Sequence, residues 1–129
     1  MMVEYRVSIS KKPTIRLYRV EGKFRKQLGE VSGWKAKLLK NTLLKELPLK
    51  EKIRYRDGRL ITEADEDTMI RIFVGIRSII NLRKEERASK ILKDIKLMDK
   101  GEVYWWHSLY LKVGYKAIQA LRLAYLGKT

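Results

Sequence analysis

The spacing of apolar residues changes near residue 62, and this change constrains the fold more than any other feature of the chain. Before that point, short runs alternate apolar and polar residues with a period of two, which is typical of half-buried strands. After it, apolar residues recur every three or four positions, which is typical of helices. The sequence therefore predicts an α+β protein with a β-rich half, about residues 1–62, and a helical half, about residues 63–127.

The β-rich half opens with three runs that read as strands and ends with one helix and a hairpin. The strand runs span about residues 3–10, 14–20 and 23–30, and they are separated by turn residues. A three-stranded antiparallel meander is the natural interpretation. A helix is predicted over about 33–47, with Ser32 as its cap, a break at Gly29 and Gly33 before it, and Pro48 after it.

An Asp-Gly pair, Asp57-Gly58, predicts a β-hairpin, because a two-residue type I′ turn needs positive φ at both central positions. The predicted partners across the hairpin are Arg56 with Arg59, Tyr55 with Leu60, and Arg54 with Ile61. Like charges directly opposite one another destabilise a strand pair. Folding alone therefore gives no reason for two facing arginines, and an arginine-tipped hairpin suits phosphate contacts. The alternative is a solvated turn with spare charge.

The helical half predicts three helices. Thr62 or Asp65 can cap the first, and its residues 69–82 are apolar nearly all round, which places it at the centre of the core. An amphipathic helix is predicted over 84–98 and a last helix over about 102–126. The predicted architecture is thus a small meander, one helix, a hairpin and a C-terminal three-helix bundle, in a single domain over residues 1–129.

The chain is strongly basic, with 30 Lys and Arg against 15 Asp and Glu, a formal net charge of +15. Repulsion among so many like charges destabilises a compact state, so a protein with such an excess of positive charge usually binds a polyanionic partner. The excess is uneven: residues 1–60 hold 17 basic and 6 acidic residues, whereas residues 61–129 hold 13 and 9. A nucleic acid bound mainly through its phosphates is the first functional hypothesis, with the β-rich half as the binding surface.

The candidate nucleic-acid-binding residues lie on the hairpin and on the meander. On the meander, basic residues alternate with Tyr18 and Phe24, as in sheets that bind single strands, although both rings are equally compatible with a core position. The predicted set is Arg54, Arg56, Arg59, Arg6, Arg16, Arg25 and Lys23. Weak sequence specificity is expected, for DNA or for RNA.

Trp105-Trp106-His107 suggests a second hypothesis, a scaffold or accessory subunit that binds an acidic protein. Trp106 falls on the apolar stripe of its helix and Trp105 does not, so Trp105 is the predicted protein-interaction residue. His107 has no second histidine or cysteine to form a metal site with, and a satisfied or solvent-facing role is expected.

No sequence motif indicates catalysis, and neither a cofactor nor a metal is expected. A small metal-dependent nuclease is a third hypothesis. It rests on short matches to a carboxylate-x-Lys pattern at Asp94 and Glu21, which are expected by chance in a chain this charged. The chain has no cysteine, no signal-like segment and no apolar run of spanning length, so a cytoplasmic location is expected. Abundant charge with few Asn and Gln residues is a thermophile-like bias.

Overall fold

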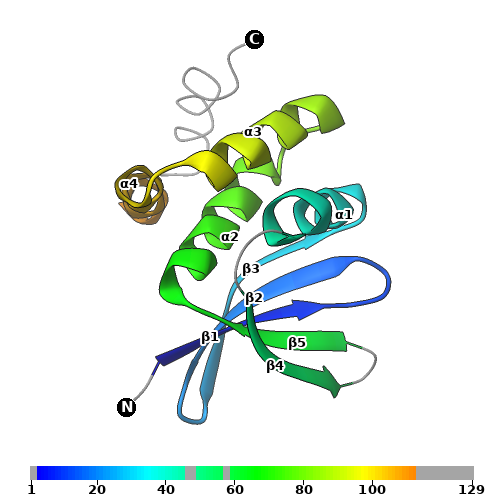
Figure 1. Ribbon diagram of the computed structural model, residues 1–129, viewed down its shortest axis with the longest axis vertical. Coiled ribbons are helices and arrows are strands. Elements are labelled where there is room, and N and C mark those ends of the chain that lie inside the picture. Colours follow the sequence, from blue (N-terminus) through cyan, green and yellow to red (C-terminus); the bar gives the residue numbers. More distant parts are fainter. Residues whose placement is uncertain (1–2, 46–48, 57–58, 113–129) are drawn as a thin grey trace.

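A five-stranded antiparallel sheet forms the base of the molecule (Figure 1). The computed structural model describes residues 3–45, 49–56 and 59–112, and residues 49–56 by their backbone only. The strands are β1 (Val3–Ile9), β2 (Thr14–Glu21), β3 (Phe24–Ser32), β4 (Leu49–Arg56) and β5 (Arg59–Ala64). Their order across the sheet is β3-β2-β1-β5-β4, so the first strand of the chain lies in the middle.

The predicted meander and the predicted hairpin are both present, and one pairing that the sequence did not predict joins them. β1 pairs with β2 on one side and with β5 on the other, where Val7 lies opposite Thr62. A meander alone leaves the free backbone groups of β1 at an edge, and β5 satisfies them. The two β segments therefore form one continuous sheet.

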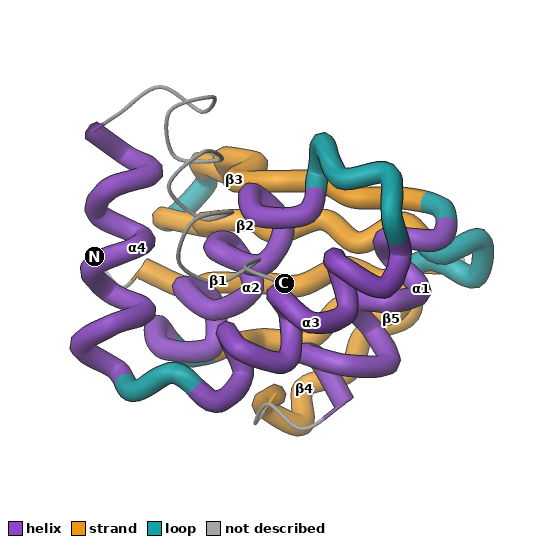
Figure 2. Tube along the Cα trace, turned by 90° about the horizontal axis from the view of Figure 1, so that it is seen from above, coloured by secondary structure: helices purple, strands orange, loops and turns teal. Residues whose placement is uncertain are grey.

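The described helices all lie on one side of this sheet, as Figure 2 shows in a view through the helices onto the strands. They are α1 (Trp34–Leu39), continued by the π-helical turn η1 (Lys40–Leu44), then α2 (Glu66–Ile79), α3 (Glu85–Leu97) and α4 (Lys100–Lys112). α1 and α2 contact the strands, and α3 and α4 pack on α2. The predicted α+β class is thus confirmed, with α2 shared between the helices and the sheet.

Several predicted boundaries move. Gly29 does not break the chain: β3 runs through it, and a Cβ there would make ordinary contact with Ile76 of α2 at 3.5 Å. Ser32 does not cap α1, because Gly33 occupies that position with a positive φ of 68° and makes no side-chain cap. The predicted stop at Pro48 and the helix beyond residue 112 lie outside the described residues.

The hydrophobic core lies between the sheet on one side and α3 and α4 on the other, and α2 runs through its centre. Asp65 caps α2 by accepting a hydrogen bond from the Thr68 N–H at 2.8 Å, as one of the two predicted caps. The next turns are buried on every side, including Arg71, whose guanidinium bonds Asp67 at 3.0 Å and the Ile95 carbonyl at 2.8 Å. A buried arginine is tolerated here because a carboxylate and a backbone carbonyl both accept from it.

Gly75 marks the point where α2 crosses its neighbours, and it provides a test of this packing. A Cβ at Gly75 would lie 2.9 Å from Leu43 Cδ2 and 3.2 Å from Leu92 Cδ2. We expect Gly75→Val to lower the free energy of unfolding in urea by about 1–3 kcal/mol, because overpacking forces buried leucines to move. The matched control is Gly101→Val on α4, where a Cβ meets only Asp99 Oδ1 at 3.4 Å. Equal losses at the two sites would contradict the crossing.

Candidate nucleic-acid interface

The candidate interface is the sheet face turned away from the helices, called here the outer face. Strand residues alternate between faces, and Val7 and Ile9 are buried in the core, so Arg6 and Ser8 belong to the outer face. Residues that pair directly on neighbouring strands lie on the same face. Tyr18 pairs with Arg6, and Arg16 and Ile61 pair with Ser8, so these three residues also belong to the outer face. The same alternation places Arg25 and Arg59 on this face.

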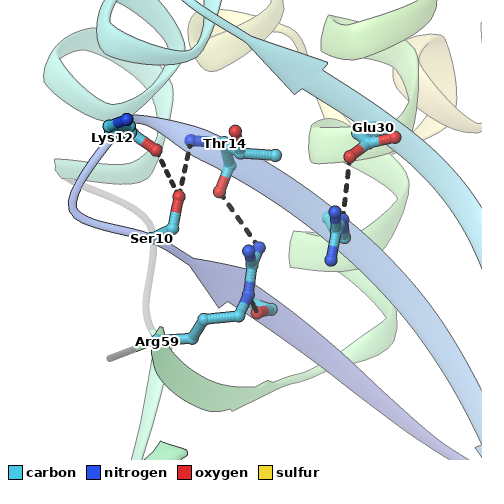
Figure 3. Close-up of polar contacts among 7 residues, drawn as sticks. Ser10, Lys12, Thr14, Glu30 and Arg59 are labelled. Carbon is cyan, nitrogen blue, oxygen red and sulfur yellow. Dashed lines mark hydrogen bonds and ion pairs between the residues drawn. The ribbon is translucent and has the colours of Figure 1, made fainter. Parts of the chain in front are cut away.

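Arg59 is hydrogen-bonded to two other strands across the outer face (Figure 3). Its Nε donates to Ser8 Oγ at 2.6 Å on β1, and its Nη2 donates to the Thr14 carbonyl at 3.3 Å at the start of β2. The Ser8 side of this contact is buried, with 3% of Ser8 exposed. Both of these partners are uncharged, so they fix the guanidinium in place without neutralising it.

Arg6 and Arg16 lie on the same face beside carboxylates. Arg6 Nε donates to Glu4 at 2.8 Å, and Arg16 Nε donates to Glu30 at 2.8 Å across the β2–β3 pair. The hydrogen bond to Glu30 raises the pKa of Arg16 above its usual value. The outer face therefore mixes arginines with glutamates, and partly exposed ion pairs of this kind contribute little to stability.

The predicted hairpin register is confirmed in the backbone. β4 and β5 pair Arg56 with Arg59, Tyr55 with Leu60 and Arg54 with Ile61. A register shift between Lys50 and Arg54 marks an irregularity further along β4. The side chains of Arg54 and Arg56 lie outside the described residues, so the hairpin contributes Arg59 to the described part of the site.

The turn between β2 and β3 carries the remaining predicted residues. Lys23 is exposed in the turn itself, and Arg25 is exposed at the start of β3, with its guanidinium 4.8 Å from the centroid of the Tyr18 ring. Tyr18 is half-buried on the outer face, whereas Phe24 is 81% exposed. The core position considered for Phe24 is therefore wrong, because the end of the hairpin bends away from the described helices (Figure 1).

Sequence reasoning missed the residues that hold Arg59. Ser8 and Thr14 are ordinary strand residues, and they reach Arg59 only because β1 pairs with β5 more than forty positions away. It also missed a groove of about 950 Å³ between α1 and α3. That groove is lined by Leu38, Lys84, Glu85, Glu86, Ser89, Lys90 and Lys93, so carboxylates offset much of its positive charge.

Trp105 and Trp106 differ in exposure, as the helical pattern predicts. Trp106 is buried, with 3% exposed, and Trp105 is 54% exposed, with the ring centroids 4.8 Å apart in an edge-to-face arrangement. His107 packs edge-on against Phe73 of α2 at 5.2 Å, as a partly buried structural residue. Trp105 is thus available on the surface of α4.

Neither a metal cluster nor a membrane-spanning helix is found in the described ranges. Between residues 3 and 112, apart from the gaps, no three His, Asp or Glu side chains lie close enough together to hold a metal ion. Over the same part of the chain, no helix combines the length and the apolar character needed to cross a bilayer.

A family model described as Domain of unknown function (DUF7680) matches residues 3–127. The chain belongs to this family. The match begins at β1 and extends past α4, so the sheet and the helices described above all lie within the DUF7680 domain. No curated protein and no solved structure matches the chain.

Arg59 should contribute to the stability of this DUF7680 domain. Arg59→Ala removes the donor to the buried Ser8 hydroxyl, and we expect the free energy of unfolding in urea to fall by about 1–3 kcal/mol. Arg83→Ala, at an exposed arginine between α2 and α3, is the control and should change it by less than about 0.5 kcal/mol. A double-mutant cycle with Ser8→Ala measures the coupling directly, and a coupling of zero would rule out the contact.

His107 should make stability depend on pH. Burial lowers the pKa of His107 below its usual value, and the Glu66 carboxylate opposes this shift. The unfolded chain therefore binds the proton more readily, so the stability due to neutral His107 is complete above the unfolded pKa of about 6.5 and is lost as the pH falls below it. Because His107 is the only histidine, we expect the urea midpoint to drop between pH 7.5 and 5.5, and to drop less in His107→Gln. The same drop in both proteins would assign it to another group.

Proposed function

We propose that this protein is a non-enzymatic nucleic-acid-binding protein that contacts mainly phosphates through the outer face and the β4–β5 hairpin. The observation that carries the proposal is the gathering of Arg6, Arg16, Arg25 and Arg59, from four strands, on the sheet face that the described helices leave uncovered. The net charge of +15 supports the proposal, because a large positive charge is typical of proteins that bind a polyanion.

Arginine is suited to this role because its planar guanidinium offers five N–H donors and stays charged. Arg59 uses two of its donors within the described residues, and the guanidinium is already held in place. A phosphate that binds there does not have to order a free side chain, so less conformational entropy is lost on binding.

The glutamates beside Arg6 and Arg16 are compatible with this proposal. Exposed ion pairs contribute little free energy, so a polyphosphate can replace Glu4 and Glu30 as the partner. The gain comes from the release of the ions condensed on the nucleic acid. Affinity should therefore be modest at physiological salt and should fall steeply as salt rises.

A second candidate function, favoured by the exposed Trp105, is that of an accessory subunit that binds an acidic protein. An exposed tryptophan is enriched at protein interfaces, and it lies on α4, in the layer of helices farthest from the sheet. The apolar contact of Trp105 would be insensitive to salt, unlike a contact with phosphates, and binding would weaken in Trp105→Ala.

The test of the first proposal is fluorescence anisotropy with labelled oligonucleotides at several salt concentrations. Three variants each remove three positive charges by substitution with Gln, so their net charges are equal. The outer-face variant changes Arg6, Arg16 and Arg25; the hairpin variant changes Arg54, Arg56 and Arg59; the control changes Arg83, Lys84 and Lys93 on the helical side.

We expect the outer-face and hairpin variants to bind more weakly and to lower the slope of log K against log salt by about one for every phosphate that is left without its arginine. The control should retain the slope, since its charges lie on α3 and just before it, and α3 is separated from the sheet by α1 and α2 (Figure 1). Equal losses of affinity in all three variants would show that only net charge matters. Intact oligonucleotide after incubation with Mg²⁺ distinguishes binding from nuclease activity.

A further inference from the structure

We infer that the β2–β3 turn is a base-stacking element, in which Phe24 stacks on an unpaired base of a single-stranded nucleic acid. The inference rests on the proposed function and names the form of nucleic acid that the outer face takes. It is carried by an exposed aromatic ring at the end of a protruding hairpin, surrounded by basic side chains.

The geometry of the turn presents the ring outward. Glu21 pairs with Phe24, which leaves only Gly22 and Lys23 to reverse the chain. Gly22 has a positive φ of 58°, which a residue with a side chain rarely adopts, so the turn is tight. The end of the hairpin bends away from the described helices (Figure 1), and Phe24 is left 81% exposed.

The chemistry around the ring is that of a polyanion site. Lys23, Arg25 and Lys26 are all exposed within two positions of Phe24. The one acidic residue of the turn, Glu21, lies 3.6 Å from Arg19, so its charge is already offset. Basic side chains that follow a backbone, together with rings that stack on bases, are what proteins use to hold single strands.

The ring lies at one end of the outer face, on the other side of β3 from the outer-face arginines. Arg25 follows Phe24 directly and points to the opposite side of β3, where its guanidinium covers the Tyr18 ring at 4.8 Å. Tyr18 pairs in turn with Arg6 on β1. A strand whose phosphates follow the outer-face arginines therefore reaches the end of the hairpin, where a base can meet Phe24.

A single strand fits this site better than a duplex or a membrane does. The bases of a duplex are stacked on one another, so the ring has no base face to contact unless the duplex opens. Membrane insertion needs a larger apolar surface, whereas the residues that follow Phe24 are Arg25, Lys26 and Gln27, all exposed and polar.

The test is fluorescence anisotropy at low salt with four labelled probes of equal length: oligo-dT, oligo-U, a DNA duplex and an abasic DNA strand. The variants are Phe24→Ala, Phe24→Leu and Phe24→Trp, and the control is Leu97→Ala on α3, whose side chain is also 81% exposed. Sedimentation with phosphatidylserine-containing vesicles tests the membrane. Urea unfolding of every variant confirms that the fold is retained.

We expect Phe24→Ala and Phe24→Leu to weaken binding to oligo-dT or oligo-U by about fivefold to a hundredfold, and Phe24→Trp to retain it. Binding to the duplex and to the abasic strand should not change, and Leu97→Ala should behave as the wild type. Leucine separates stacking from simple apolar contact, because it is apolar but has no ring.

Two results would overturn the inference while leaving the proposed function intact. One is wild-type affinity of Phe24→Ala for the single strands, and the other is retained binding in Phe24→Leu. Vesicle binding that Phe24→Ala abolishes, without any effect on the oligonucleotides, would also overturn it in favour of a membrane. Failure of the wild type to bind any of the four nucleic-acid probes would instead refute the proposed function, and the inference with it.

Discussion

The backbone pairing of β5 with β1 is the constraint on which the rest of the structure depends. It joins a meander from the start of the chain to a hairpin that follows α1, and it leaves β1 bonded on both sides. It also brings Arg59 within reach of Ser8 and Thr14. Without this pairing, the arginines of the two β segments would lie on separate sheets, and no common outer face would form.

The second constraint is the burial of α2, which decides which sheet face stays uncovered. Because α2 is apolar nearly all round, it has to be covered by the sheet and α1 on one side and by α3 and α4 on the other. This places every described helix on one side of the strands (Figure 2). The face that the described helices leave uncovered is the one on which Arg6, Arg16 and Arg59 lie.

The charged groups of this molecule differ from one surface to another in the partners that hold them. The outer-face glutamates offset part of the local charge, and the groove between α1 and α3 carries glutamates as well as lysines. On the outer face, Arg59 is held by uncharged partners and Arg25 lies over the Tyr18 ring. Guanidinium groups fixed in this way can meet phosphates with little further loss of conformational entropy.

The sequence by itself determined the approximate places of the described strands and helices and the hairpin register, because period, turn residues and caps are local: the Asp57-Gly58 pair predicts the partner of Arg59, and Asp65 caps α2. It also indicated that Trp105, rather than Trp106, is exposed. Only the tertiary structure decided that β5 joins β1, that Ser8 holds Arg59 and that Phe24 is exposed. These depend on contacts between residues far apart in the chain and on where the helices end over the sheet, and no local pattern of apolar and polar residues encodes either.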